Sequence, residues 1–127
     1  MKFQPDTLAG VNSISRFDGD NLRVNADLVF TSSVIVPWTG QARAWDAASL
    51  QALTPAHFES LLAFEPEVVI FGSGAKLQFV SPALYRSLIA RRVGIETMDS
   101  GAACRTYNVL ASEGRKVVGA ILLAPAA

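Results

Sequence analysis

Hydrophobic and polar residues alternate along the first part of the chain, which is the pattern of half-buried β-strands. The segments SISRF (13–17) and LRVNADLVF (22–30) flank DGDN (18–21), whose Asp-Gly pair favours a tight hairpin turn. The segment SSVIVP (32–37) is largely apolar and predicts a buried strand that stops at its proline. We therefore expect antiparallel β structure at the front of the chain.

From residue 54 the period changes to that of a helix. The segment TPAHFESLLAF (54–64) has Thr54 as the N-cap and Pro55 at the first helical position. Its apolar stripe consists of Phe58, Leu61 and Leu62. The pattern predicts one amphipathic helix.

A second helix is predicted over SPALYRSLIARRVG (81–94). Ser81 is the expected N-cap, and Gly94 is the expected stop signal. The predicted apolar stripe consists of Leu84, Tyr85, Leu88 and Ile89. This helix leads into the next strand.

Short apolar runs separate these helices and predict buried strands at EVVIF (67–71), IETM (95–98) and KVVGAILLA (116–124), with LQFV (77–80) as a further short strand. A third helix is expected from the cap Asp99 to Gly114. Strand, helix, strand, helix, strand is the pattern of a parallel sheet with right-handed crossovers. We therefore predict a single compact layered α/β domain over residues 1–127, with a parallel C-terminal half and N-terminal antiparallel hairpins packed on it.

Composition narrows the classes of partner. Of the 127 residues, 50% are hydrophobic and 17% are charged, against roughly 25% charged residues in an average domain. Such a chain has apolar surface to hide in a protein client or in a second copy of itself. Eleven basic and eleven acidic residues cancel, which argues against binding of nucleic acid.

The cysteine count and the two ends of the chain indicate the cellular compartment. One cysteine excludes an internal disulfide, and one cysteine with one histidine argues against a structural zinc site. The first residues, MKFQPDTLAG (1–10), lack the apolar core of a signal peptide, and the apolar run at 117–125 is too short to cross a bilayer. We expect a bacterial cytoplasmic protein without a membrane span, a metal or a cofactor.

Chain direction predicts where a binding site lies. If the strands at 67–71 and 95–98 are parallel neighbours, their C-terminal ends share one edge of the sheet. The bend Gly72-Ser73-Gly74 then lies beside the bend Asp99-Ser100-Gly101. Ligands of open α/β sheets bind in the crevice at these ends. Small residues there let a partner approach the backbone closely.

The third helix adds Gly101 and three polar or reactive candidates, Cys104, Arg105 and Asn108. A helical projection groups Ala103, Tyr107, Leu110 and Ala111 toward the core, and Gly101, Arg105, Asn108 and Ser112 on the opposite face. Arg105 would then lie near a helix N-terminus, where a small anion or a client carboxylate is favoured. An internal acidic partner is the equal alternative, with Glu96 as one candidate.

Cys104 lies at the boundary between the two faces. A helix N-terminus and a neighbouring arginine both lower the pKa of a thiol. Nucleophilic catalysis also needs a base, and the single histidine, His57, belongs to a different predicted helix. We therefore assign no catalytic residue and expect a buried packing thiol. The segment GSGAK (72–76) lacks phosphate-loop spacing, so a turn is the favoured interpretation.

Several of these segments together resemble a known family. The run GIETMDSGAACRTYNVLASEGRKVVGAIL (94–122), the strand followed by GSG at 68–74, and SSVIVP followed by Trp45 are similar to its motifs. The family includes the mitochondrial complex I assembly factor three and the adipogenesis-associated domain protein. The resemblance implies a compact α/β layered domain with a role in protein interaction or assembly. The matching motif residues are Gly72, Gly74, Met98, Asp99, Cys104, Arg105, Thr106, Tyr107 and Asn108.

Two functions remain open from the sequence. The first is a non-enzymatic interaction domain that holds a polar or acidic segment of a client. The second is an anion-binding or small-molecule-binding protein, including an enzyme that uses Cys104. The candidate binding residues are the same for both: Gly72, Ser73, Gly74, Asp99, Gly101, Cys104, Arg105 and Asn108.

Overall fold

A computed structural model of the chain describes residues 10–124. Its elements, in chain order, are β1 (Ile14–Phe17), β2 (Leu22–Val24), β3 (Leu28–Phe30), β4 (Val34–Pro37), β5 (Arg43–Ala44), η1 (Leu50–Ala52), α1 (Pro55–Glu59), η2 (Ser60–Phe64), β6 (Val68–Gly72), η3 (Pro82–Tyr85), α2 (Arg86–Ala90), β7 (Gly94–Met98), α3 (Ser100–Ser112) and β8 (Val117–Ile121). The expectation that residues 1–10 contain no signal peptide concerns a segment of which residues 1–9 lie outside the described residues. No described helix is long and apolar enough to cross a bilayer.

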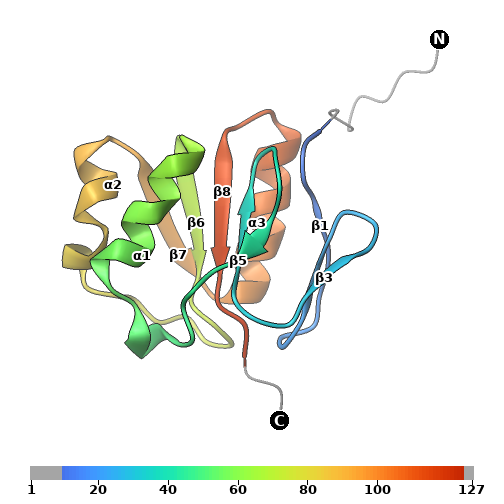
Figure 1. The fold of residues 1–127 in the computed structure, drawn as a ribbon, viewed down its shortest axis with the longest axis horizontal. Coiled ribbons are helices and arrows are strands. Elements are labelled where there is room, and N and C mark those ends of the chain that lie inside the picture. Colours follow the sequence, from blue (N-terminus) through green and yellow to red (C-terminus); the bar gives the residue numbers. More distant parts are fainter. Residues whose placement is uncertain (1–9, 125–127) are drawn as a thin grey trace.

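The predicted α/β class is confirmed by a five-stranded sheet with the order β5-β4-β8-β6-β7 (Figure 1). β6 runs parallel to both β7 and β8, as the crossover pattern predicts. β4 pairs antiparallel with β8 and with β5. The N-terminal hairpins form a separate three-stranded antiparallel sheet, β1-β2-β3, so they pack on the main sheet rather than extend it.

The main sheet is covered on both faces. One face packs against α1 and α2 around the buried rings of Phe58 and Phe71. The other face packs against α3, and the small sheet flanks that helix through β1 (Figure 1). Because its central strands are buried on both faces, they have continuous apolar sequences such as Val68–Gly72.

Polar contacts fix α3 between the two sheets. The buried Tyr107 hydroxyl lies 3.0 Å from the Pro37 carbonyl and 3.1 Å from the Asn12 carbonyl, and it donates toward both. The next residue, Asn108, donates to the Ile14 carbonyl and accepts from the Ile14 N–H, each at 2.8 Å. A single helix therefore holds β1 and the end of β4 in place.

Two predicted strands are wrong. The segment 22–30 is not one strand, because Asn25 adopts φ 57° and turns the chain between β2 and β3. Asparagine tolerates this left-handed conformation better than most residues. The segment 77–80 is not a strand either. It pairs with no strand of either sheet, and Leu77 and Phe79 are 52% and 74% exposed.

The helix predicted over 81–94 is shorter than expected. Ser81 caps η3 as predicted, but α2 ends at Ala90, and Gly94 begins β7 instead of stopping the helix. Arg92 takes the left-handed position with φ 60°. The Val93 N–H bonds to the Leu88 carbonyl, and both side chains are buried together, which is the hydrophobic contact of a Schellman ending. Ile89, predicted in the core, is 54% exposed.

Candidate functional site

The two predicted bends do meet at one edge of the sheet. The Ser73 N–H donates to the Met98 carbonyl at 2.8 Å, and the Ser100 N–H donates to the Gly74 carbonyl at 2.8 Å. The Gly74 N–H in turn donates to Ser100 Oγ at 2.9 Å. The juxtaposition predicted from chain direction is therefore confirmed.

The same contacts close the predicted crevice. Ser100 is buried, and its hydroxyl donates to the Leu122 carbonyl at 2.6 Å. Ser73 is also buried, and its hydroxyl accepts from the Gln78 N–H at 3.0 Å. The backbone groups of the two bends thus bond to each other and to neighbouring chain. A ligand would meet an interlocked surface at this edge rather than a cleft.

The start of α3 is likewise occupied by the chain itself. The Asp99 carboxylate accepts from the Ala102 N–H at 2.9 Å, and the Asp99 carbonyl accepts from the Ala103 N–H at 2.9 Å. Asp99 is the N-cap, as predicted. The carboxylate of the cap already lies where an anion would bind, and this arrangement does not favour a small anion at the helix start.

Arg105 remains exposed on the surface of α3. The ion pairs within residues 10–124 join Arg16 to Asp18 and Arg115 to Glu67, and neither involves Arg105. Glu96, the predicted internal partner of Arg105, is exposed and forms no ion pair in that range. The expected internal pairing with Glu96 is wrong.

A small hollow of about 220 Å³ lies between β1 and the first turns of α3. Four predicted site residues line it: Gly101, Cys104, Arg105 and Asn108. Asn108 is not the free outward-facing residue that the helical projection suggests, because its amide is bonded to Ile14. On the α3 side of this hollow, Arg105 is therefore the polar side chain that a partner can reach, and the exposed Ser15 and Arg16 line its β1 side.

Cys104 is a poor nucleophile in this environment. The residue is 4% exposed, and burial raises the pKa of its thiol from 9.0 to about 12. The Arg105 guanidinium acts in the opposite direction and offsets only part of the effect. His57 contacts the edge of Trp45, which belongs to the core cluster on the other face of the main sheet. The geometry supports the packing interpretation of this residue.

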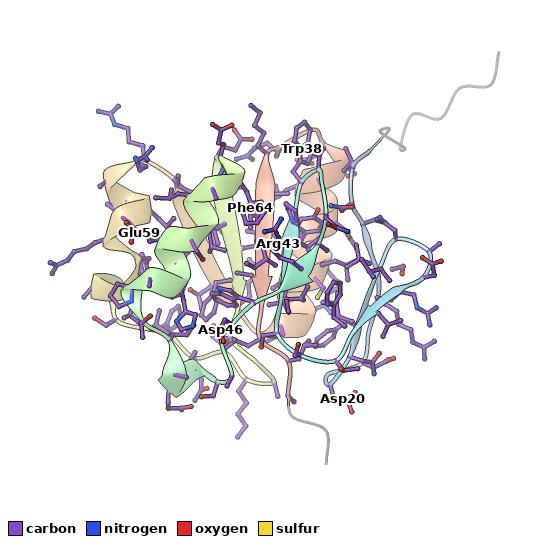
Figure 2. All side chains as sticks on the ribbon, viewed as in Figure 1. Asp20, Trp38, Arg43, Asp46, Glu59 and Phe64 are labelled. Atoms are coloured by element: carbon purple, nitrogen blue, oxygen red, sulfur yellow. The ribbon has the colours of Figure 1, made fainter. Side chains whose placement is uncertain are left out.

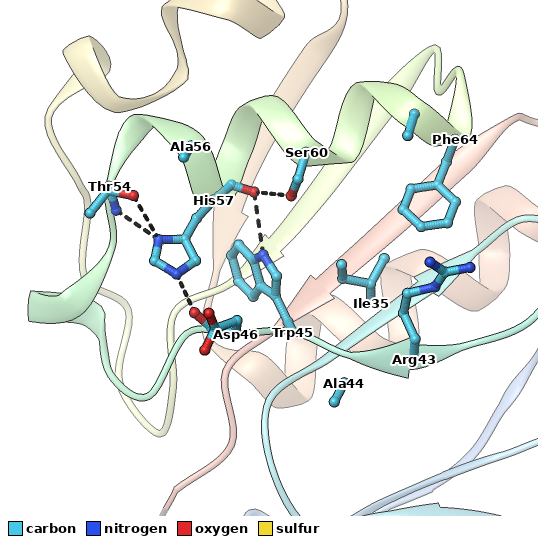
Figure 3. Close-up of a pocket in the computed structure, with 11 residues that line it drawn as sticks. Ile35, Arg43, Ala44, Trp45, Asp46, Thr54, Ala56, His57, Ser60 and Phe64 are labelled. Carbon is cyan, nitrogen blue, oxygen red and sulfur yellow. Dashed lines mark hydrogen bonds between the residues drawn. The ribbon is translucent and has the colours of Figure 1, made fainter.

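Sequence reasoning missed an open pocket of about 480 Å³ between β5 and α1 (Figure 3). Ile35, Trp45 and Phe64 supply apolar walls. The Arg43 guanidinium lies over the Phe64 ring, 5.2 Å from its centroid, and Asp46 lies at the other end of the pocket (Figures 2 and 3). The pocket therefore offers an apolar floor between a cation and a carboxylate.

His57 belongs to the wall of this pocket, and both of its ring nitrogens are engaged. Nδ1 accepts from the Thr54 N–H at 2.9 Å, and Nε2 contacts the Asp46 carbonyl (Figure 3). These partners require the neutral tautomer with the proton on Nε2. The Trp45 indole N–H donates to the His57 carbonyl at 3.3 Å. The ring therefore has a structural role: it caps α1 and ties it to the loop after β5.

Replacing His57 by alanine should destabilise the fold by about 1 kcal/mol, the usual cost of losing a helix cap. The Thr54 N–H loses its acceptor, while the buried Trp45 bond to the backbone carbonyl is retained. Urea unfolding measures the change in free energy. Glu59→Ala, an exposed change on the same helix, is the matched control and should stay within about 0.5 kcal/mol of wild type. Equal stability of the two variants would contradict the capping role.

No group of three or more histidine, cysteine or carboxylate side chains gathers for a metal ion within the part of the chain that the structure describes.

Comparisons with known proteins support the resemblance seen in the motifs. A profile of the family described as "Protein of unknown function (DUF498/DUF598)" matches residues 14–122. The Rattus norvegicus protein named NADH dehydrogenase (ubiquinone) 1 alpha subcomplex assembly factor 3 is 30% identical over 114 residues. This match covers 88% of the chain and 60% of the rat protein.

Two solved bacterial structures share the fold along nearly the whole chain. A crystal structure of a Bordetella parapertussis protein has a TM-score of 0.85 and 29% identity, covering 93% of this chain and 100% of that one. A solution structure of a Xanthomonas campestris protein has a TM-score of 0.77 and 35% identity, covering 96% and 89%. The predicted layered α/β domain is thus found in relatives solved by experiment.

Proposed function

The chain belongs to the DUF498/DUF598 family of proteins of unknown function, and on that premise we propose that it is a non-enzymatic, assembly-factor-like domain that binds a client protein. The observation that carries the proposal is the 114-residue match to a named assembly factor, which runs through both sheets and α3. The chain spans 60% of that relative's length, so the relative's own partners are not assigned to this chain. A bacterial cytoplasm is the proposed location.

The proposed client surface is the end of the main sheet where the two bends meet, together with the hollow between β1 and α3. Arg105 is exposed there without an ion pair in residues 10–124. The loop after β6 begins at the same end of the sheet (Figure 1), and its Leu77 and Phe79 side chains are exposed. An exposed arginine beside exposed apolar groups suits a client segment that carries a carboxylate.

The alternative, an anion-binding or small-molecule-binding protein, has less support at this edge. Cys104 is buried and its thiol pKa is raised, and the Asp99 carboxylate occupies the start of α3. The pocket between β5 and α1 is the feature that favours a small molecule. Its apolar floor and its two charged ends equally suit a side chain of a client protein.

Replacing Arg105 by alanine should weaken client capture about three- to tenfold, the cost of an arginine that contributes to an interface without dominating it. The measurement is quantitative mass spectrometry of proteins retained by the tagged domain from a lysate of the source organism. Arg105→Lys should retain part of the binding, because it keeps the charge but loses the planar fork of donors.

The matched control is Arg86→Ala, an exposed arginine on α2, which covers the opposite face of the main sheet. It should leave capture unchanged. An Arg105→Ala variant that is folded and retains the same clients at the same level would remove Arg105 from the proposed surface.

A further inference from the structure

The last strand of the main sheet, β7, has an open edge. It pairs with β6 and ends the order β5-β4-β8-β6-β7 (Figure 1). The Gly94 N–H donates to the Glu67 carbonyl at 3.1 Å, and the Met98 carbonyl accepts from the Ser73 N–H at 2.8 Å. Because backbone groups alternate in direction along a strand, Ile95 and Thr97 direct their N–H and C=O groups away from β6. Within residues 10–124, these four groups have no ladder partner.

β7 is the longest of the edge strands in the described part of the fold. It has five residues, all exposed or half-buried, whereas β1 has four residues, β3 has three and β5 has two. A row of unpaired backbone donors and acceptors is a template for another strand. Extended peptides bind many domains by adding a strand at such an edge.

We propose that the edge of β7 binds an extended segment of a partner protein as an antiparallel sixth strand, with a lysine or arginine of the partner opposite Glu96. This inference rests on the proposed interaction function and assigns it a second surface, separate from Arg105.

Charge selects the occupant of this edge. Glu96 lies at the centre of β7 and is exposed. A second copy of the chain, paired antiparallel over the full strand about a two-fold axis, would place Glu96 directly opposite its own symmetry mate. Like charges directly opposite each other destabilise a strand pair, and opposite charges stabilise it. The edge therefore disfavours the chain itself and favours a cationic residue in another protein.

The residues before β7 and the two faces of this strand indicate the other residues expected in the partner segment. Arg91 and Arg92 are exposed immediately before the strand, so an antiparallel partner should carry acidic residues after the stretch that faces Gly94. Ile95 packs against the α1 and α2 side of the sheet, and Met98 packs against the α3 side. Partner residues opposite Ile95 and Thr97 would therefore extend an apolar face, which favours β-branched side chains.

A synthetic peptide tests this specification directly. The probe is acetyl-Thr-Val-Lys-Val-Thr-Asp-Glu-amide, titrated to millimolar concentration into the ¹⁵N-labelled protein. We expect amide shift changes concentrated on residues 94–98 and slower hydrogen exchange at the Ile95 and Thr97 amides. A peptide with Glu in place of Lys should bind about two- to tenfold more weakly. In the Glu96→Lys variant the preference between the two peptides should reverse.

Backbone variants separate strand pairing from side-chain attraction. Thr97→Pro removes an outward N–H without removing a bond to β6, so the fold should persist and peptide binding should be lost. Thr97→Val keeps the N–H and should bind like wild type. Arg105→Ala should also bind the peptide like wild type. The peptide titration therefore tests the β7 edge independently of the proposed client surface at Arg105.

Three outcomes would overturn the proposal. One is the absence of shift changes on residues 94–98 at millimolar peptide. Another is a Glu peptide that binds as tightly as the Lys peptide. The third is broadening of the amide NMR signals of residues 94–98 as the protein concentration rises in samples without peptide. That result would identify a second copy of the chain as the occupant of the edge.

Discussion

Raising the pH above 9 should cost this fold a large part of its stability, and Cys104 should be a main cause. Burial of the thiol raises its pKa from 9.0 to about 12 in the folded state. Between these two values the unfolded chain loses the proton and the folded chain keeps it. The free energy of unfolding then falls with rising pH, because the unfolded state binds fewer protons.

The stabilising contribution of the neutral thiol is fully present below pH 9 and is lost as the pH rises toward 12. Each such group contributes a slope of up to about 1.4 kcal/mol per pH unit, so the thiol accounts for about 4 kcal/mol over the whole interval. Burial also raises the pKa of Tyr107 above its ordinary value, so its phenol adds a second loss above pH 10.

Urea unfolding at intervals from pH 7 to pH 10.5 measures this slope. In Cys104→Ala the slope between pH 9 and pH 10 should be shallower, although the variant is less stable at pH 7 because a small cavity is left. Tyr107→Phe is the matched comparison, since it should retain the wild-type slope up to pH 10. A Cys104→Ala slope identical to that of wild type between pH 9 and pH 10 would show that the thiol is not buried as described.

Adding a methyl group at Gly72 should destabilise the fold by about 1–3 kcal/mol, the range for overpacked cores. Gly72 ends β6 directly beneath the start of α3. A Cβ at this position would lie 2.8 Å from Ser100 Oγ, 3.0 Å from Ser100 Cα and 3.2 Å from Ala103 Cβ. The neighbour cannot move freely, because Ser100 Oγ is bonded to Leu122 and Gly74.

Gly94→Ala is the matched control, because Gly94 is also in a strand of the same sheet. A Cβ there would meet Val68 Cγ2 at 3.6 Å, which is ordinary contact. This variant should be neutral or slightly stabilising, since alanine restricts the unfolded chain. Thermal and urea unfolding of both variants give the comparison. A Gly72→Ala protein as stable as Gly94→Ala would mean that the two bends are not tightly interlocked.

Much of the fold was predictable because local signals agree with the tertiary structure. Asp99 and Ser81 cap the helices that the sequence assigns to them, and Gly114 ends α3 with φ 83°. The continuous apolar run Val117–Ile121 forms a strand buried on both faces. The caps, the glycine with positive φ and the apolar run each have a local sequence signal. These elements can therefore be predicted without knowing what packs against them.

Two of the errors, in the segments 22–30 and 81–94, occur where a non-glycine residue adopts the positive φ that glycine usually provides. Asn25 and Arg92 both have positive φ, and each ends an element that the sequence pattern extends. At Arg92 the cost is offset by the buried contact between Val93 and Leu88, which depends on tertiary packing. Such compensation cannot be read from spacing along the chain.

The candidate site was predictable in position but not in character. Chain direction places the bends at 72–74 and 99–101 together, but it does not reveal that their own hydrogen bonds close the gap. The pocket between β5 and α1 was missed because Arg43 and Phe64 are far apart in sequence and carry no motif. The histidine that caps α1 was missed too, since the expected residue at that position is Glu or Gln.

The position of α3 between the two sheets has a consequence for how the molecule opens. Tyr107 and Asn108 bond to the backbone of Asn12 and Ile14, so detaching the small sheet breaks these bonds and leaves the Asn108 amide without its partners. It also removes the Asn12 amide from the Pro37 carbonyl. Partial unfolding that frees only the front of the chain is therefore penalised by the loss of these hydrogen bonds. The two sheets should melt together as one cooperative unit, and the N-terminal hairpins should not exist as an independently detachable flap.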